Sequence, residues 1–83
     1  MAIVTVTYKG RTLEIPYRPE HTVQRLTAEA IRAHGLRFAA NAHLRLHTAA
    51  GRQLKHEITA KRARIQPGAA LALQTPELPK EEG

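Results

Sequence analysis

Apolar and polar residues alternate on both sides of the dipeptide Lys9-Gly10. A period of two is typical of half-buried β-strands, in which successive side chains point to opposite faces. Glycine adopts the positive φ that a tight hairpin requires, so we expect Lys9-Gly10 to form a two-residue loop. The turn and the apolar pattern then agree on a single strand register. The expected pairs are Tyr8 with Arg11, Val6 with Leu13 and Val4 with Ile15.

The spacing of apolar residues changes to that of a helix after Pro19. The hydroxyl of Thr22 can accept a hydrogen bond from the first turn, and Gly35 can take the left-handed conformation that often follows a helix. Between them, apolar residues recur at the i, i+3, i+7 and i+8 spacing of one helix face. The pattern predicts a helix over residues 23–34, against whose end Leu36 folds back. The predicted face consists of Val23, Leu26, Ala30 and Ile31.

Shorter elements are expected in the second half of the chain, after a connection at residues 37–42. A third strand follows, in which Leu44 and Leu46 alternate with polar residues. Residues 52–55 are expected to form a short fourth strand, and residues 69–74 the last one. The irregular stretch between these two strands is expected to contain one helical turn started by Thr59.

The order of these elements predicts an α+β fold. One helix covers the apolar face of a mixed sheet of four to five strands that wraps around it. The first and last strands are expected to form a parallel central pair, because the helix and loops supply the long crossover that parallel pairing needs. Residues 75–83, TPELPKEEG, contain two prolines and one large apolar residue, which cannot support a core. The chain thus divides into a domain at 1–74 and a flexible tail at 75–83.

Length and cysteine content limit the possible functions. Eighty-three residues make one domain with a thin core and leave no room for a separate catalytic cleft of the usual volume. The absence of cysteine excludes disulfides, thiolate metal sites and a thiol nucleophile on this chain. The N-terminus lacks the basic and apolar regions of a signal peptide, and no apolar run reaches transmembrane length. We therefore expect a cytoplasmic binding or carrier protein and no enzyme.

The chain carries a net charge of +6, from 13 lysines and arginines against 7 aspartates and glutamates. This balance indicates an acidic partner or nucleic acid, or simply an arginine-rich surface, which we favour. Aromatic residues are 4% of the chain, too few for the stacking surface on which single-stranded nucleic acids bind. The run Lys61-Arg62-Ala63-Arg64 can contact phosphate or an acidic partner, although a solvated loop is the simpler interpretation. Arg45, Arg52 and Lys55 can extend this basic surface across the sheet.

The histidines do not predict a metal site. His43 and His47 share one face of a strand but lie about 13 Å apart, so we expect two solvated, outward side chains. His21, His34 and His56 have no carboxylate cluster near them in the sequence. The sequence shows no nucleophile–base order and no phosphate-binding glycine loop, and we expect no catalytic residue, no metal and no cofactor.

The order and spacing of these features resemble the β-grasp fold of ubiquitin over residues 1–74. Pro19 and Thr22 match a Pro-x-x-Thr helix start, and Gly51-Arg52-Gln53-Leu54 is similar to the Gly-Lys-Gln-Leu of ubiquitin's short fourth strand. Leu44-Arg45, Gly51 and Pro67-Gly68 also resemble small bacterial ubiquitin-like proteins of conjugation systems. The resemblance implies four kinds of partner: an adenylating activating enzyme, a cysteine-bearing conjugating enzyme, a deconjugating protease and target protein amines.

The sequence departs from ubiquitin at positions that matter for function. It ends Glu81-Glu82-Gly83 rather than in diglycine, so sulfur carriers with a diglycine end are a weaker match. Arg45 takes the position of ubiquitin's exposed third-strand isoleucine, and Gln74 lies near the position of its outward last-strand valine. Partners that bind ubiquitin's apolar patch are therefore not expected to bind here.

The resemblance implies a protein modifier whose reacting group is the carboxylate of Gly83. It would be adenylated, passed to the cysteine of a conjugating enzyme and joined to a target amine. The alternative is a non-conjugated adaptor or a subunit of a larger complex, as in type VII secretion, and nucleic-acid binding is a third possibility. Targets, partner identity, oligomeric state and any residues beyond Gly83 stay open. The residues expected to contact partners are Arg45, Arg52, Lys55, Gln74 and Glu82.

Overall fold

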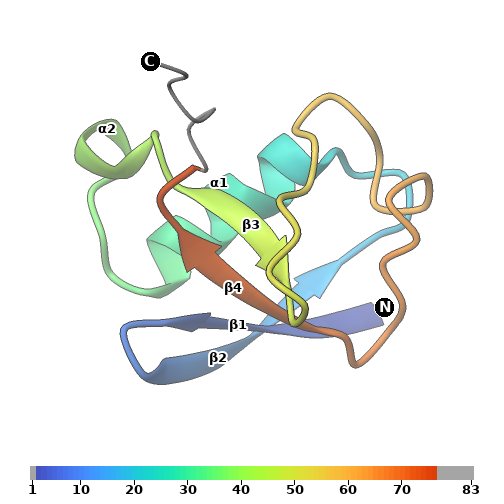
Figure 1. The fold of residues 1–83 in the computed structure, drawn as a ribbon, viewed down its shortest axis with the longest axis horizontal. Coiled ribbons are helices and arrows are strands. Elements are labelled where there is room, and N and C mark those ends of the chain that lie inside the picture. The colour runs from blue at the N-terminus through green and yellow to red at the C-terminus, as the bar shows by residue number, and fades with distance from the viewer. Residues whose placement is uncertain (1, 77–83) are drawn as a thin grey trace, which may run out of the picture.

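The computed structural model describes residues 2–76 and contains a four-stranded mixed sheet of order β2-β1-β4-β3. Helix α1 packs across one face of this sheet (Figure 1). The two central strands, β1 and β4, run parallel, and each outer strand pairs antiparallel with its neighbour. This confirms the predicted α+β class and the predicted central pair. The main elements are β1 (Ala2–Tyr8), β2 (Arg11–Tyr17), α1 (Val23–Ala33), β3 (Arg45–Thr48) and β4 (Ala70–Gln74).

The hairpin of β1 and β2 has the register that the sequence predicts. Tyr8 pairs with Arg11, Val6 with Leu13 and Val4 with Ile15. Both turn residues have positive φ, 50° at Lys9 and 81° at Gly10. This is the turn geometry whose twist matches that of the two strands, so the turn fixes which side chains enter the core.

Helix α1 begins and ends at the predicted signals. The Arg25 N–H donates to the hydroxyl of Thr22 at 3.2 Å. At the other end, Gly35 has φ 73° and donates to the Arg32 carbonyl at 2.9 Å, while the Leu36 N–H donates to the Ile31 carbonyl at 3.1 Å. These two bonds form a Schellman motif. The helix end is thereby closed without borrowing donors from the sheet.

The core lies between α1 and the sheet, and one histidine belongs to it. His34 is buried at the end of α1, with its Nε2 3.0 Å from the carbonyl of Val6 on β1. A carbonyl only accepts hydrogen bonds, so this contact requires the ring proton on Nε2. The fully buried aliphatic side chains include Val4, Val6, Val23, Leu26, Ile31 and Leu46.

Among residues 2–76, no helix is long and apolar enough to cross a membrane.

Two predicted elements differ in the structure. The stretch at 37–42, expected to be a connection, contains the short helix α2 (Phe38–Asn41), and the Arg32 guanidinium lies 5.7 Å from the Phe38 ring centroid. The fourth strand predicted at 52–55 is wrong, because only one isolated bridge, between His47 and Gln53, forms there. The segment leaves β3 after a few residues, since the chain must turn toward the start of α1.

Removing a buried strand side chain should destabilise the domain far more than removing an exposed one of the same type. Ile15 is 2% exposed on the inner face and Ile3 is 43% exposed on the outer face. Ile15→Ala should lower the free energy of unfolding by about 2–5 kcal/mol, and Ile3→Ala by less than about 1 kcal/mol. Urea titration of both variants measures this difference. Equal losses would show that the core does not lie on the face of the sheet assigned here.

Candidate partner-binding groove

The segment between β3 and β4 is irregular but firmly held. Ala60 is fully buried, and its N–H donates to the His21 carbonyl at 2.8 Å. Thr59 starts the predicted helical turn, since its carbonyl accepts from the Ala63 N–H at 2.9 Å and its hydroxyl from the Arg62 N–H at 3.2 Å. Where the turn ends, the Tyr17 hydroxyl donates to the Ile65 carbonyl at 3.2 Å. Side chains on this segment therefore have a fixed base.

The same segment satisfies the start of helix α1. The first N–H groups of a helix have no partner within the helix. Here the Val23 N–H donates to the Ile58 carbonyl at 2.8 Å, and the Gln24 N–H donates to the His56 carbonyl at 3.2 Å. These bonds place Ile58 beside the helix start.

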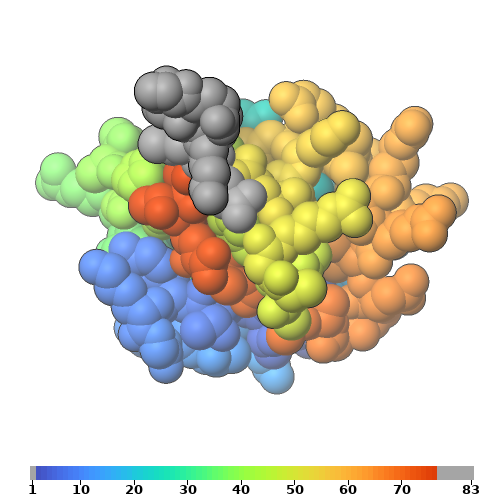
Figure 2. Space-filling view, viewed as in Figure 1, coloured from blue at the N-terminus to red at the C-terminus, as the bar shows by residue number. Residues whose placement is uncertain are grey.

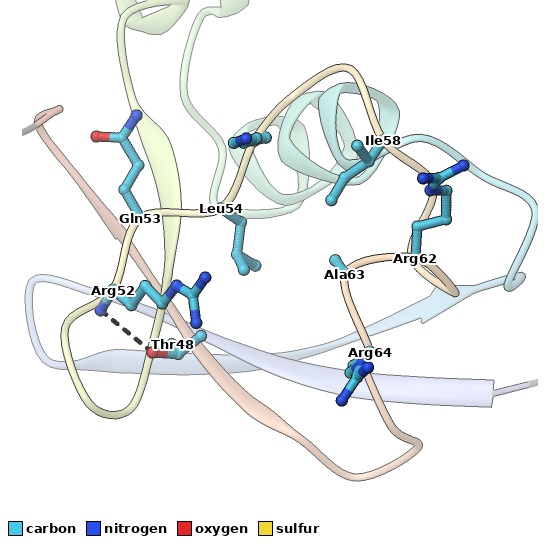
Figure 3. A pocket seen from close by; sticks show the side chains of 9 residues that line it. Thr48, Arg52, Gln53, Leu54, Ile58, Arg62, Ala63 and Arg64 are labelled. Atoms are coloured by element: carbon cyan, nitrogen blue, oxygen red, sulfur yellow. Dashed lines mark hydrogen bonds between the residues drawn. The ribbon is translucent and has the colours of Figure 1, made fainter.

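The beginning of the segment covers the outer edge of β3. The Thr48 N–H donates to the Arg52 carbonyl, and the Leu54 N–H donates to the Leu46 carbonyl, both at 2.9 Å. The Thr48 hydroxyl accepts from the Arg52 N–H at 3.2 Å (Figure 3). Because this edge is already paired, a partner here would have to bind through side chains rather than by adding a strand.

A hollow of about 530 Å³ lies between the two parts of this segment. The expectation that so short a chain has no room for a cleft of the usual volume is therefore wrong as to size. We call this hollow the basic groove. Leu54, Ile58 and Ala63 form its apolar floor, Arg52 enters from the β3 side, and Arg62 and Arg64 stand opposite (Figure 3). Figure 2 shows the two stretches, yellow near residue 50 and orange near residue 60, with side chains projecting from both. The complete lining is Thr48, Arg52, Gln53, Leu54, Lys55, Ile58, Arg62, Ala63 and Arg64.

The groove is positively charged without local compensation. Its four cationic side chains are all exposed, and no aspartate or glutamate lines it. Within residues 2–76, the one ion pair closer than 4 Å joins Arg25 and Glu29 on α1, at 3.8 Å. Like charges held around one hollow add their fields, which favours an anionic ligand.

The backbone of Arg64 has an unfavourable conformation. Its φ is 60°, a left-handed conformation that is about 1–2 kcal/mol unfavourable for a residue with a Cβ and is common for glycine and asparagine. The turn is closed there by the Arg64 N–H, which donates to the Lys61 carbonyl at 3.0 Å. An arginine at this position therefore adds a charge to the groove at some expense of stability.

The structure brings some of the predicted contact residues together and separates others. Arg52 and Lys55 line the groove with Arg62 and Arg64, so the basic run expected to be a solvated loop forms one side of a concave surface. Arg45 is not part of it, because its guanidinium donates to the carbonyls of Ala42 at 2.9 Å and Leu44 at 3.0 Å.

The remaining predicted site residues lie elsewhere. Gln74 lines a separate hollow at the end of β4, together with Tyr8, Lys9, His43 and Thr75. Glu82 and Gly83 lie outside the described residues. The sequence predicts that Arg52 and Lys55 extend the basic surface of the run at 61–64, and both lie beside Arg62 and Arg64. The concave shape of this surface and its apolar floor are not signalled by the spacing of the basic residues.

The prediction that His43 and His47 are both solvated is wrong for His47. Its side chain is 1% exposed, whereas His43 is exposed. The His47 ring has Nδ1 3.1 Å from the Arg45 carbonyl, and its buried Nε2 has no hydrogen-bond partner within the described part of the chain. Alternation predicts the face on which a side chain lies. It does not predict that the following segment returns to β3 and that Gln53 pairs with His47 in an isolated bridge.

The pKa of His56 is shifted downward, away from the ordinary value of 6.5. Burial is the main cause, the positive charge of Arg45 adds to it, and Glu57 opposes both. The buried Nε2 of His56 has no hydrogen-bond partner among residues 2–76. A protonated ring would leave a buried donor unpaired, which also disfavours the charged form.

Comparison with known proteins identifies the fold. No protein-family profile and no curated protein sequence matches the chain. Among solved structures it is similar to a de novo designed protein based on ubiquitin, with a TM-score of 0.76 and 24% sequence identity over 98% of this chain and 95% of that one. The chain therefore has the ubiquitin-like β-grasp fold.

The downward pKa shift of His56 makes stability depend on pH. Below the unfolded value of about 6.5, the unfolded chain binds more protons at His56 than the folded one, so acid favours unfolding. The contribution is complete above about pH 6.5 and is lost as the pH falls toward the lower folded value. His56→Gln should flatten the fall in unfolding free energy between about pH 7 and pH 5. Urea titration of both proteins at several pH values measures this fall in unfolding free energy.

His43→Gln is the matched control, because His43 is exposed. Its unfolding free energy should fall with pH as steeply as that of the unmodified protein. Arg45→Gln should reduce the slope partly, since it removes the second cause of the shift. An unchanged slope in His56→Gln would contradict the assignment.

Proposed function

We propose that this chain is a ubiquitin-like protein modifier whose Gly83 is joined to amines of target proteins. The observation that supports the proposal is the ubiquitin-like grasp fold together with the place where the described chain leaves it. Central strand β4 ends at Gln74, and exposed Thr75 lies in a hollow with Tyr8 and Lys9 of the hairpin. The chain at Thr75 therefore lies at the surface rather than in the core.

The proposed chemistry belongs to partner enzymes and needs a free carboxylate on Gly83. That carboxylate attacks the α-phosphorus of ATP on an activating enzyme, which releases pyrophosphate and forms an acyl adenylate. A cysteine thiolate then displaces AMP and forms a thioester, as this chain has no cysteine of its own. A target amine attacks the thioester carbonyl, the thiolate leaves and an amide bond forms. Glycine at the reacting position allows close approach of partner backbone because it has no Cβ.

The partner enzymes in this proposal bind a surface unlike that of ubiquitin. Arg45 and Gln74 are paired neighbours on β3 and β4, at the positions where the resemblance places ubiquitin's apolar side chains. An apolar patch is a common basis of protein recognition, whereas this place is polar. An activating enzyme, a conjugating enzyme and a deconjugating protease for this chain would then need complementary polar groups.

A non-conjugated adaptor is the second candidate, and the basic groove favours it. The groove is built entirely from the folded body, by residues between Thr48 and Arg64. A protein that acts only by docking would use such a surface and would not need Gly83.

Deleting Gly83 separates the two candidates. With a candidate activating enzyme and ATP, the modifier should support exchange of labelled pyrophosphate into ATP, and the Gly83 deletion should abolish it because the reacting carboxylate is displaced. Glu81→Gln, which changes the same segment but keeps Gly83, should retain exchange. Binding to partners that is equal with and without Gly83, with no exchange in either, would exclude the modifier and favour the adaptor.

A further inference from the structure

We propose that the basic groove binds an acidic, leucine-containing peptide segment of a partner protein. The inference rests on the folded body alone and is independent of conjugation at Gly83. It names the ligand for the docking surface that the adaptor candidate requires.

The charge of the groove selects an anion. Arg52, Arg62 and Arg64 each present a planar guanidinium, which pairs with a carboxylate or a phosphate through two parallel hydrogen bonds. Lys55 adds a fourth cation, and no carboxylate lines the hollow to neutralise them. These side chains make no ion pair among residues 2–76, so a ligand would not have to displace an internal partner.

The apolar floor of the groove favours a ligand that carries an aliphatic group between its anionic groups. Leu54 is buried, and Ile58 and Ala63 are half-buried with their side chains toward the hollow (Figure 3). Apolar area removed from water contributes about 25 cal/mol per Å², so a leucine placed there would add affinity that a bare anion lacks. A peptide carries carboxylates and aliphatic side chains on one chain, and it meets both requirements.

The composition of the groove argues against nucleic acid. Single-stranded nucleic acids depend on aromatic side chains for stacking, and no aromatic residue lines the hollow. Its volume of about 530 Å³ lies within the roughly 300–1,000 Å³ of ligand pockets. That space holds a few side chains of a peptide and not a folded domain.

The conformation of Arg64 fits a binding role. A glycine or asparagine would tolerate its φ of 60° with less strain. The arginine therefore places its charge opposite Arg52 in a conformation that stability alone does not favour. Strain of this kind is often found at ligand sites, and here it adds to the argument from charge and shape.

The test measures binding of a short fluorescein-labelled peptide that alternates glutamate and leucine, by fluorescence anisotropy. The double variant Arg52→Gln, Arg64→Asn should weaken binding at least about tenfold, and added salt should weaken binding to the unmodified protein. Asparagine tolerates the left-handed backbone, so the variant should melt at the same or a higher temperature. The matched control Arg11→Gln, Arg37→Gln loses the same charge from exposed positions outside the groove and should bind within about twofold of the unmodified protein.

Three results would overturn the proposal: no binding of the glutamate–leucine peptide, equal weakening in the groove and control variants, or tighter binding of a single-stranded DNA oligonucleotide. A peptide of glutamates alone should bind more weakly, because it leaves the floor uncovered. Equal binding of that peptide would be a fourth result against the proposal, since it would remove leucine from the ligand. Pyrophosphate exchange at Gly83 can succeed or fail without changing any of these outcomes, so the two proposals are tested separately.

Discussion

The parallel pairing of β1 with β4 is the constraint on which the rest of the molecule depends. Val6 lies opposite Leu71, and the Thr5 N–H donates to the Ala69 carbonyl at 2.9 Å. Parallel neighbours cannot be joined by a tight turn, so everything between β2 and β4 must serve as a crossover. One helix of 11 residues covers only part of the sheet. The chain between β3 and β4 has to cover the remainder, and that requirement gives it a defined shape without regular secondary structure.

The irregular segment is ordered because it meets several separate demands in a short length. It pairs with β3 through a single bridge at Gln53, supplies carbonyls to the start of α1 from His56 and Ile58, and buries Ala60. No continuous helix or strand could make all of these contacts. The concave surface between its two halves follows from this path, and the groove is therefore a product of the same bonds that complete the fold.

Local signals in the sequence predict the elements that depend on neighbouring residues. The Lys9-Gly10 turn and the two alternating runs predict the hairpin register, because the turn type and the apolar face agree. Thr22 and Gly35 predict both ends of α1, because capping involves residues within one turn. These features predict the inner face of the sheet, and with it most of the core.

The features that the sequence does not predict are those set by contacts between distant segments. The burial of His47, the loss of the fourth strand and the hollow between Arg52 and Arg62 all depend on where the irregular segment lies against β3 and α1. The sequence accordingly predicts a basic surface that joins Arg52 to the run at 61–64, but it does not predict that this surface is concave.

The likeness of this chain to ubiquitin extends to the fold but not to the surface that would bind partners. The fold is maintained by buried positions such as Val4, Val6 and Leu46, and many sequences satisfy that pattern if volume and periodicity are kept. Positions outside the core are not bound by this requirement. Here they carry the half-buried Arg45, where the resemblance places an isoleucine, and the exposed arginines of the basic groove. Because binding is decided by exposed groups and their charges, function in this fold has to be inferred from the groove and the outer strands.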